Sequence, residues 1–243
     1  MSHRYIGLSF IFIAFIFLTG CLFPDSEKAK NKVPNEEQLE SIQLAVENYQ
    51  KETGGLLPIK TKESDTPLFQ KYLIDFSKLK EHHLITDIPG NAFENGGIYQ
   101  YTIIDPEGDP QVKLIDLRLS EAIRKINVKL DIYRDEHIYP PFGKEIEEGL
   151  YDIDYKKLGL KNPPKVVSPY SKENLPIIMD RDGELYIDYR IDLYNALNEY
   201  DHNYKNGDDI RYILAENTPF VPVYSLPYTV ENGEPVFYTD EIQ

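Results

Sequence analysis

Apolar side chains recur at helical spacing in three stretches of the chain. The first two stretches share a spacing of three, four and three residues, which places their members on one face of a helix. Gly54-Gly55 follows the first stretch and Pro140-Pro141 the second, and both pairs are helix breakers. We therefore expect amphipathic helices at Leu39, Ile42, Val46 and Tyr49, at Ile123, Ile126, Leu130 and Tyr133, and at Leu193, Leu197, Tyr200 and Tyr204.

Runs of β-forming residues around turn signals follow each predicted helix. They predict one antiparallel β-hairpin per helix, the last of them around the favoured turn dipeptide Asn232-Gly233. The expected hairpins pair residues 98–104 with 112–119 and 175–179 with 185–189, and a third hairpin lies within 220–238.

Short apolar runs between helix and hairpin also recur, over residues 72–79 and 151–158. Asp75 and Asp154 precede a short turn of helix in these runs, where a carboxylate accepts hydrogen bonds from free backbone N–H groups. On the strands that follow, Asp116 with Arg118 and Asp188 with Arg190 are predicted to form exposed ion pairs.

The common order of these elements predicts an α+β fold of two to three repeated units, each an amphipathic helix followed by an antiparallel β-hairpin. The units are expected at residues 38–119, 120–191 and, as a partial copy, 192–243. This plan is similar to the globular part of type II secretion pseudopilins in fold alone. The pilin helix with its early glutamate is missing, so filament assembly is not implied.

The N-terminal residues have the pattern of an export signal. Arg4 precedes an apolar run that is short for a membrane span, and Leu18-Thr19-Gly20-Cys21 matches a lipobox. We expect a signal peptide over residues 1–20, lipidation of Cys21, and a charged tether over 21–37. The predicted location is the extracytoplasmic face of the cell membrane, with acylated Cys21 in the lipid bilayer.

Charge and composition narrow the classes of partner. The formal net charge is −15, which makes nucleic acid an improbable partner. Cys21 is the only cysteine, so no disulfide within the chain supports the fold, and stability must come from packing. We expect the folded part to be monomeric.

No catalytic or metal-binding motif stands out. The sequence has no Gly-x-Ser-x-Gly elbow, His-Glu-x-x-His or phosphate-binding loop, and its histidines lack metal-ligand spacing. The segment 180–184 resembles a calcium loop but lacks two of its ligands, so a hairpin turn is the preferred interpretation. We predict no catalytic residue, no metal and no cofactor, and expect that the protein is not an enzyme.

The chain has nineteen tyrosines and no tryptophan. Core and cross-strand packing explains most of these tyrosines. The apolar, proline-stiffened segment 221–228 is the best local candidate for a ligand-binding surface, with Tyr224, Leu226, Pro227 and Tyr228 as its candidate contacts.

Five segments carry a resemblance to the YphF-type lipoproteins of bacilli: residues 21–24, 54–61, 89–94, 154–159 and 224–229. Together they span most of the chain after the signal. Members of that family have been labelled substrate-binding components of ABC transporters, so the resemblance implies a transporter role. The sequence supports this role weakly, since a two-lobed binding protein is expected to have alternating βαβ units.

The leading hypothesis is therefore a membrane-anchored binding or scaffold module of the cell envelope, with an envelope protein or the cell wall as partner. The first alternative is a solute-binding component of an ABC transporter, which should have one closed, partly apolar pocket. The second is an envelope hydrolase, which should bring two carboxylates with shifted pKa values into one cleft.

Overall fold

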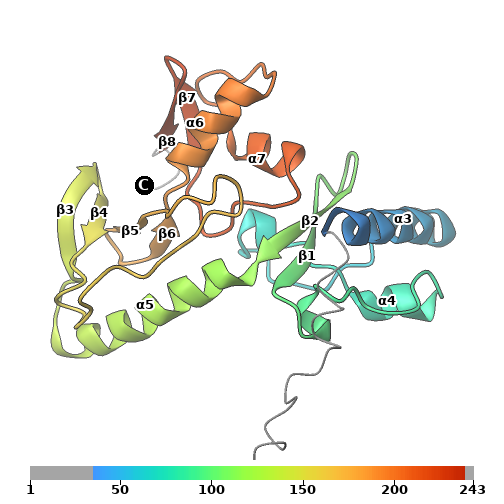
Figure 1. Cartoon of the computed structure of the whole chain (residues 1–243), viewed down its shortest axis with the longest axis horizontal. Helices are drawn as coiled ribbons and strands as arrows, with labels where there is room; N and C mark the ends of the chain where they lie inside the picture. The colour runs from blue at the N-terminus through green and yellow to red at the C-terminus, as the bar shows by residue number, and fades with distance from the viewer. Residues whose placement is uncertain (1–34, 239–243) are drawn as a thin grey trace, which may run out of the picture. The chain divides into compact units, whose positions relative to one another are not determined.

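The first helix forms where the apolar pattern predicts it, and its apolar face is buried. The computed structural model describes residues 35–238 (Figure 1). Helix α3 (Asn35–Thr53) buries Ile42, Val46 and Tyr49, as predicted. The predicted signal peptide (1–20), the lipidation site Cys21 and residues 22–34 of the tether lie outside the described residues, whereas residues 35–37 form the first turn of α3.

The described residues form a mixed α+β fold with five α-helices and three small antiparallel sheets. The sheets are β1-β2, β3-β4-β5-β6 and β7-β8. Besides α3, the elements are α4 (Phe76–Glu81), β1 (Tyr99–Ile104), β2 (Gln111–Asp116), α5 (Leu117–Glu136), β3 (Phe142–Glu147), β4 (Leu150–Ile153), β5 (Ile177–Asp180), β6 (Leu185–Ile187), α6 (Arg190–Glu199), α7 (Arg211–Asn217), β7 (Tyr228–Glu231) and β8 (Glu234–Phe237), with 3₁₀ turns η2 (Leu68–Gln70) and η3 (Phe93–Asn95).

Two hydrophobic cores hold these elements together. The first is built from α3, α4 and the β1-β2 hairpin, drawn blue to green in Figure 1. The second and larger core contains the inner face of α5 and most apolar residues that follow it. Phe69, Leu73 and Ile115 from the first region also pack in the larger core, so the two regions share side chains.

Asp75 caps α4 as predicted, since its carboxylate accepts a hydrogen bond from the Ser77 N–H at 3.1 Å. The corresponding run after β3 folds differently. Residues 150–153 form β4, and 155–159 form turns without a helix, although Asp154 still accepts a hydrogen bond from the Lys156 N–H at 3.2 Å. The prediction of a short helix there was wrong, because this run pairs with β3 and β5.

The predicted strand 112–119 ends earlier than expected, because residues 117–119 already belong to α5. Asp116 is therefore the N-cap of α5 and accepts a hydrogen bond from the Arg118 N–H at 3.0 Å. Asp116 and Arg118 form the predicted ion pair, but not as an exposed pair on a strand: the Asp116 side chain is buried, and Arg118 lies on α5. At the third predicted helix, α6 ends at Glu199, so Tyr204 lies beyond it.

The C-terminal region attaches to the first hairpin through a short parallel contact. The Leu114 N–H donates to the Pro219 carbonyl at 2.8 Å, and the Val221 N–H donates to the Leu114 carbonyl at 3.1 Å. Beside this contact, buried Lys113 donates to the carbonyls of Glu216 and Thr218. Residues 218–221 are therefore fixed to the edge of β2.

Within residues 35–238, none of the helices is both long and apolar enough to cross a membrane.

A candidate binding groove beside helix α5

The predicted binding surface at residues 221–228 is largely inside the protein. Leu226 is 4% exposed and Tyr228 is fully buried, so neither can contact a ligand on the surface. The hydroxyl of Tyr228 accepts a hydrogen bond from the Tyr189 N–H at 3.0 Å. Leu226 and Tyr228 are buried because the apolar segment packs in the larger core, whereas Tyr224, Ser225 and Pro227 remain partly exposed.

The surface feature that best fits a binding role is a pair of adjoining depressions beside α5, of about 690 and 600 Å³. Both are lined by Phe93, Leu117 and Glu121, so we treat them as one site, the α5 groove. One half also contains Ile98, Arg118, Lys125 and Lys165, and the other contains Gln100, Arg124, Val128, Asp131 and Tyr224.

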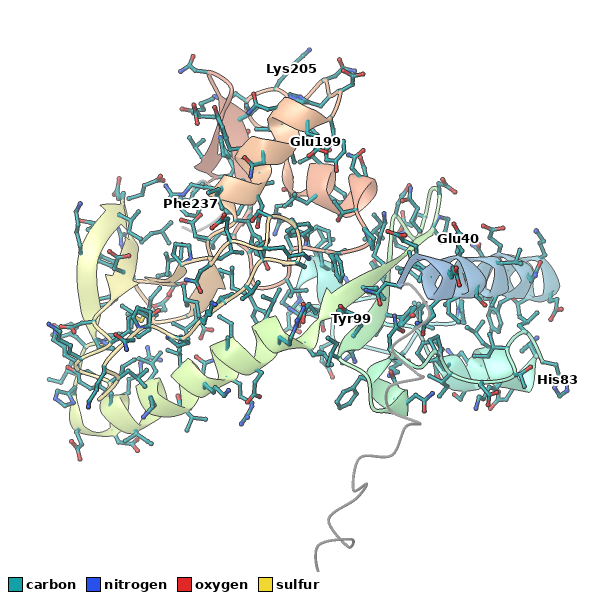
Figure 2. The ribbon with its side chains drawn as sticks, viewed as in Figure 1. Glu40, His83, Tyr99, Glu199, Lys205 and Phe237 are labelled. Carbon is teal, nitrogen blue, oxygen red and sulfur yellow. The ribbon has the colours of Figure 1, made fainter. Side chains whose placement is uncertain are left out.

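The apolar part of the groove contains large side chains that are exposed to solvent. Phe93 is 59% exposed and Ile98 is 43% exposed. Phe93 lies on η3, and Ile98 precedes β1 at its junction with α5, where Tyr99 pairs with Asp116 (Figure 2). Covering such a side chain with a partner is favourable by roughly 1.5–3 kcal/mol.

The loop that carries Phe93 is held by a buried asparagine. Asn91 accepts a hydrogen bond from the Tyr101 hydroxyl at 2.7 Å and donates to the Asn35 side chain at 2.9 Å. The Gly97 N–H closes the loop by donating to the Ala92 carbonyl at 2.8 Å. The exposed position of Phe93 is thus fixed by the loop around it.

The cationic part of the groove begins at Arg118. Its Nε and one terminal nitrogen donate to both carboxylate oxygens of buried Asp116, and this pairing raises the pKa of the Arg118 guanidinium. We call this pairing of an aspartate with the arginine two residues later an Asp-x-Arg clip. The same clip occurs at Asp188–Arg190 and Asp209–Arg211. A local ion pair of this kind fixes the direction of an arginine fork.

The three clips differ at the remaining terminal nitrogen, Nη1. That atom of Arg190 donates to Glu147 at 3.4 Å, and that of Arg211 donates to the Ser225 carbonyl at 3.3 Å. Within the described residues, Nη1 of Arg118 has no protein acceptor, and Arg118 lines the groove. The groove therefore contains a fixed guanidinium edge that can donate to an anion.

Among the described residues, the two carboxylates whose pKa values are raised by burial do not lie in this groove. Burial raises the pKa of Glu147, but its neighbour is Arg190 and it lies outside the α5 groove. Burial also raises the pKa of Asp192, whose carboxylate accepts a hydrogen bond from the Ser168 hydroxyl at 2.8 Å inside the protein. Both carboxylates are accounted for by structural contacts.

No group of three or more metal-ligating side chains comes together in residues 35–238. The 180–184 segment is a hairpin turn in which the Asp180 carboxylate accepts hydrogen bonds from the N–H groups of Asp182 and Glu184. His82 and His83 lie at the exposed end of α4.

Replacing Gly97 by alanine is expected to displace the Phe93 loop, because the new Cβ would lie 2.0 Å from the Asn91 carbonyl oxygen. We expect Gly97→Ala to lower the free energy of unfolding by about 1–3 kcal/mol and to expose residues 91–97 to limited proteolysis. Gly54→Ala serves as a comparison, because its Cβ would meet no atom within 4 Å although its φ is +74°: it adds backbone strain without a clash and should leave residues 91–97 protected. Unchanged proteolysis of Gly97→Ala would show that the loop tolerates the side chain.

A comparison with protein families finds a match, and it covers the first structural region. Residues 35–116 match the YphF family N-terminal domain, from the start of α3 to the Asp116 cap of α5. No curated protein and no solved structure matches the chain. Phe93 and Ile98 belong to the matched region, whereas Arg118 and Lys125 follow it, so the α5 groove lies where this domain meets the rest of the chain. The match identifies residues 35–116 as a YphF family N-terminal domain.

Proposed function

We propose that the protein is a membrane-anchored extracytoplasmic lipoprotein that acts as a binding or scaffold module in the cell envelope, and that a partner protein docks in the α5 groove. The lipobox at Cys21 supports the location. The exposed ring of Phe93, on a loop held by buried Asn91, supports the binding role. An exposed aromatic ring on a well-held loop is a typical anchor for a protein partner.

The form of the groove favours a protein partner over a small solute. A solute-binding component would enclose most of its ligand, whereas both depressions beside α5 are open to solvent. The lining residues extend along α5 from Leu117 to Asp131, which corresponds to about 21 Å of helix. A groove of this length suits an extended peptide segment better than a compact solute.

We also infer that the chain is built from repeated helix-and-hairpin units. The support is local: α5 and α6 both follow a hairpin strand, and an Asp-x-Arg clip joins strand to helix in each case. The β3-β4 hairpin would then be an insertion in the second unit.

Photo-crosslinking in intact membranes tests the docking proposal. The full chain would carry a photoreactive phenylalanine analogue in place of Phe93 or, as control, in place of Leu44, which is 58% exposed on α3. We expect a discrete adduct with one envelope protein from the Phe93 variant and none from the Leu44 variant. The same adducts from both variants, or none from Phe93, would contradict docking in the α5 groove.

A further inference from the structure

We propose that the α5 groove recognises an acidic, apolar peptide segment, whose carboxylate pairs with Arg118 while a neighbouring apolar side chain covers Phe93 and Ile98. This inference rests on the proposed function and specifies the chemistry of the partner.

The three Asp-x-Arg clips differ in what their arginines contact. In the clips of Arg190 and Arg211, a protein acceptor occupies the nitrogen that the aspartate leaves free. Arg118 has the same clip and lines an open groove, and its corresponding nitrogen has no acceptor among the described residues. A carboxylate of a partner supplies the acceptor that the other two clips find within the chain. Because Asp116 already fixes the guanidinium, little side-chain entropy is lost when the carboxylate binds.

Local charge supports an acidic partner. Arg118, Lys125 and Lys165 line one half of the groove, although the whole chain has a net charge of −15. The carboxylate in this half, Glu121, is paired with Arg124 at 2.8 Å and with Lys125 at 3.4 Å. An acidic segment therefore meets a locally cationic surface. A second copy of this chain is a less favourable occupant, because two strongly anionic molecules repel each other.

The apolar residues determine the rest of the segment. Phe93, Ile98 and Leu117 lie beside Arg118 in the same half of the groove. A carboxylate on Arg118 thus places a leucine or phenylalanine two positions away in the segment over these side chains. Alternate residues of an extended strand point in opposite directions, so a leucine two positions away lies on the same side as the glutamate.

A matched pair of synthetic peptides tests this recognition. Both peptides have about six residues, enough to span the groove at about 3.4 Å per residue, and carry leucines around one central glutamate or glutamine. An uncharged fluorophore reports binding to the full chain by anisotropy. We expect the glutamate peptide to bind about tenfold more tightly than the glutamine peptide, and the difference to shrink at high salt.

Arg118→Gln should remove the difference between the two peptides and leave binding of the glutamine peptide within about twofold. Arg181→Gln, which changes an equally exposed arginine paired with Glu148, should keep the difference. Equal affinities for the wild-type chain, no binding of either peptide, or a preference that survives Arg118→Gln would overturn the proposal. If the Phe93 variant still gives its crosslink in any of these three cases, the docking proposal stands and only the proposed recognition of a carboxylate is wrong. A crosslink between two copies of this chain would instead identify the groove as a self-association surface.

Discussion

Raising the pH above 10 is expected to unfold the protein cooperatively, because ionisation of buried tyrosines is compatible only with the unfolded chain. Burial raises the pKa of Tyr170, Tyr189 and Tyr228 far above 10, and raises the pKa of Tyr155 and Tyr204 to about 12. The stabilising contribution of these phenols is complete below pH 10 and is lost as the pH rises toward their folded-state pKa values.

The size of the effect follows from the three fully buried hydroxyls. One pH unit above 10, each costs about 1.4 kcal/mol, or about 4 kcal/mol together, against a typical total of 5–15 kcal/mol. Lys113 acts in the opposite direction, since burial lowers its pKa and its contribution therefore rises with pH up to about 10.5. One lysine does not offset three tyrosines, so we expect unfolding between about pH 11 and 12.

The absence of tryptophan makes tyrosinate absorbance a clean probe of this transition. We expect the buried tyrosines to ionise only as the circular dichroism of the folded chain is lost. In urea, all tyrosines should ionise in one step near the ordinary pKa of about 10. Complete ionisation near pH 10 with folded dichroism would contradict the burial of these hydroxyls.

Helical periodicity located the long helices because burial on one face repeats along the sequence. Ile123, Ile126 and Leu130 are all buried on α5, as the pattern indicates. The start of α5 was missed because residues 112–119 are apolar at both strand and helix spacing. The buried cap Asp116 decides the boundary, and its burial depends on contacts that the local sequence does not specify.

Strand β3 was missed for the opposite reason. It lies at the edge of its sheet, contains three charged residues and pairs with β4 through shifts in register, so it has no regular alternation. The burial of Leu226 and Tyr228 was missed for a related reason, since an apolar segment rich in proline fits both an exposed surface and a core. In the structure this segment lies beside β6, where the Ile187 N–H donates a hydrogen bond to the Tyr224 carbonyl.

The α5 groove combines segments near residues 93–98, 117–131 and 164–165, which are distant in sequence. Sequence alone places Phe93 in a loop that contains proline and glycine. An aromatic residue in such a loop is only a weak indication of a binding site. The Asp-x-Arg spacing was visible, but only the structure distinguishes the clip that faces a groove from the two whose arginines find internal acceptors.

Replacing Lys113 by methionine is expected to loosen the attachment between the YphF N-terminal domain and the C-terminal region. Lys113 is 7% exposed, and its ammonium group donates to the carbonyls of Glu216 and Thr218 at 3.1 and 3.0 Å. These carbonyls lie at the C-terminal end of α7, where the helix dipole favours a cation. Methionine preserves much of the apolar stem but leaves both carbonyls without this donor.

We expect Lys113→Met to lower the free energy of unfolding by about 2 kcal/mol, the usual scale for losing charged hydrogen bonds in a buried site. Urea denaturation measures this change, and Lys125→Met, at an exposed position of α5, should stay within about 0.5 kcal/mol of the wild type. Hydrogen exchange should also increase first at the N–H groups of Leu114 and Val221, whose hydrogen bonds join β2 to residues 219–221. An unchanged unfolding free energy would contradict this prediction and would mean that desolvation of the ammonium group cancels its hydrogen bonds.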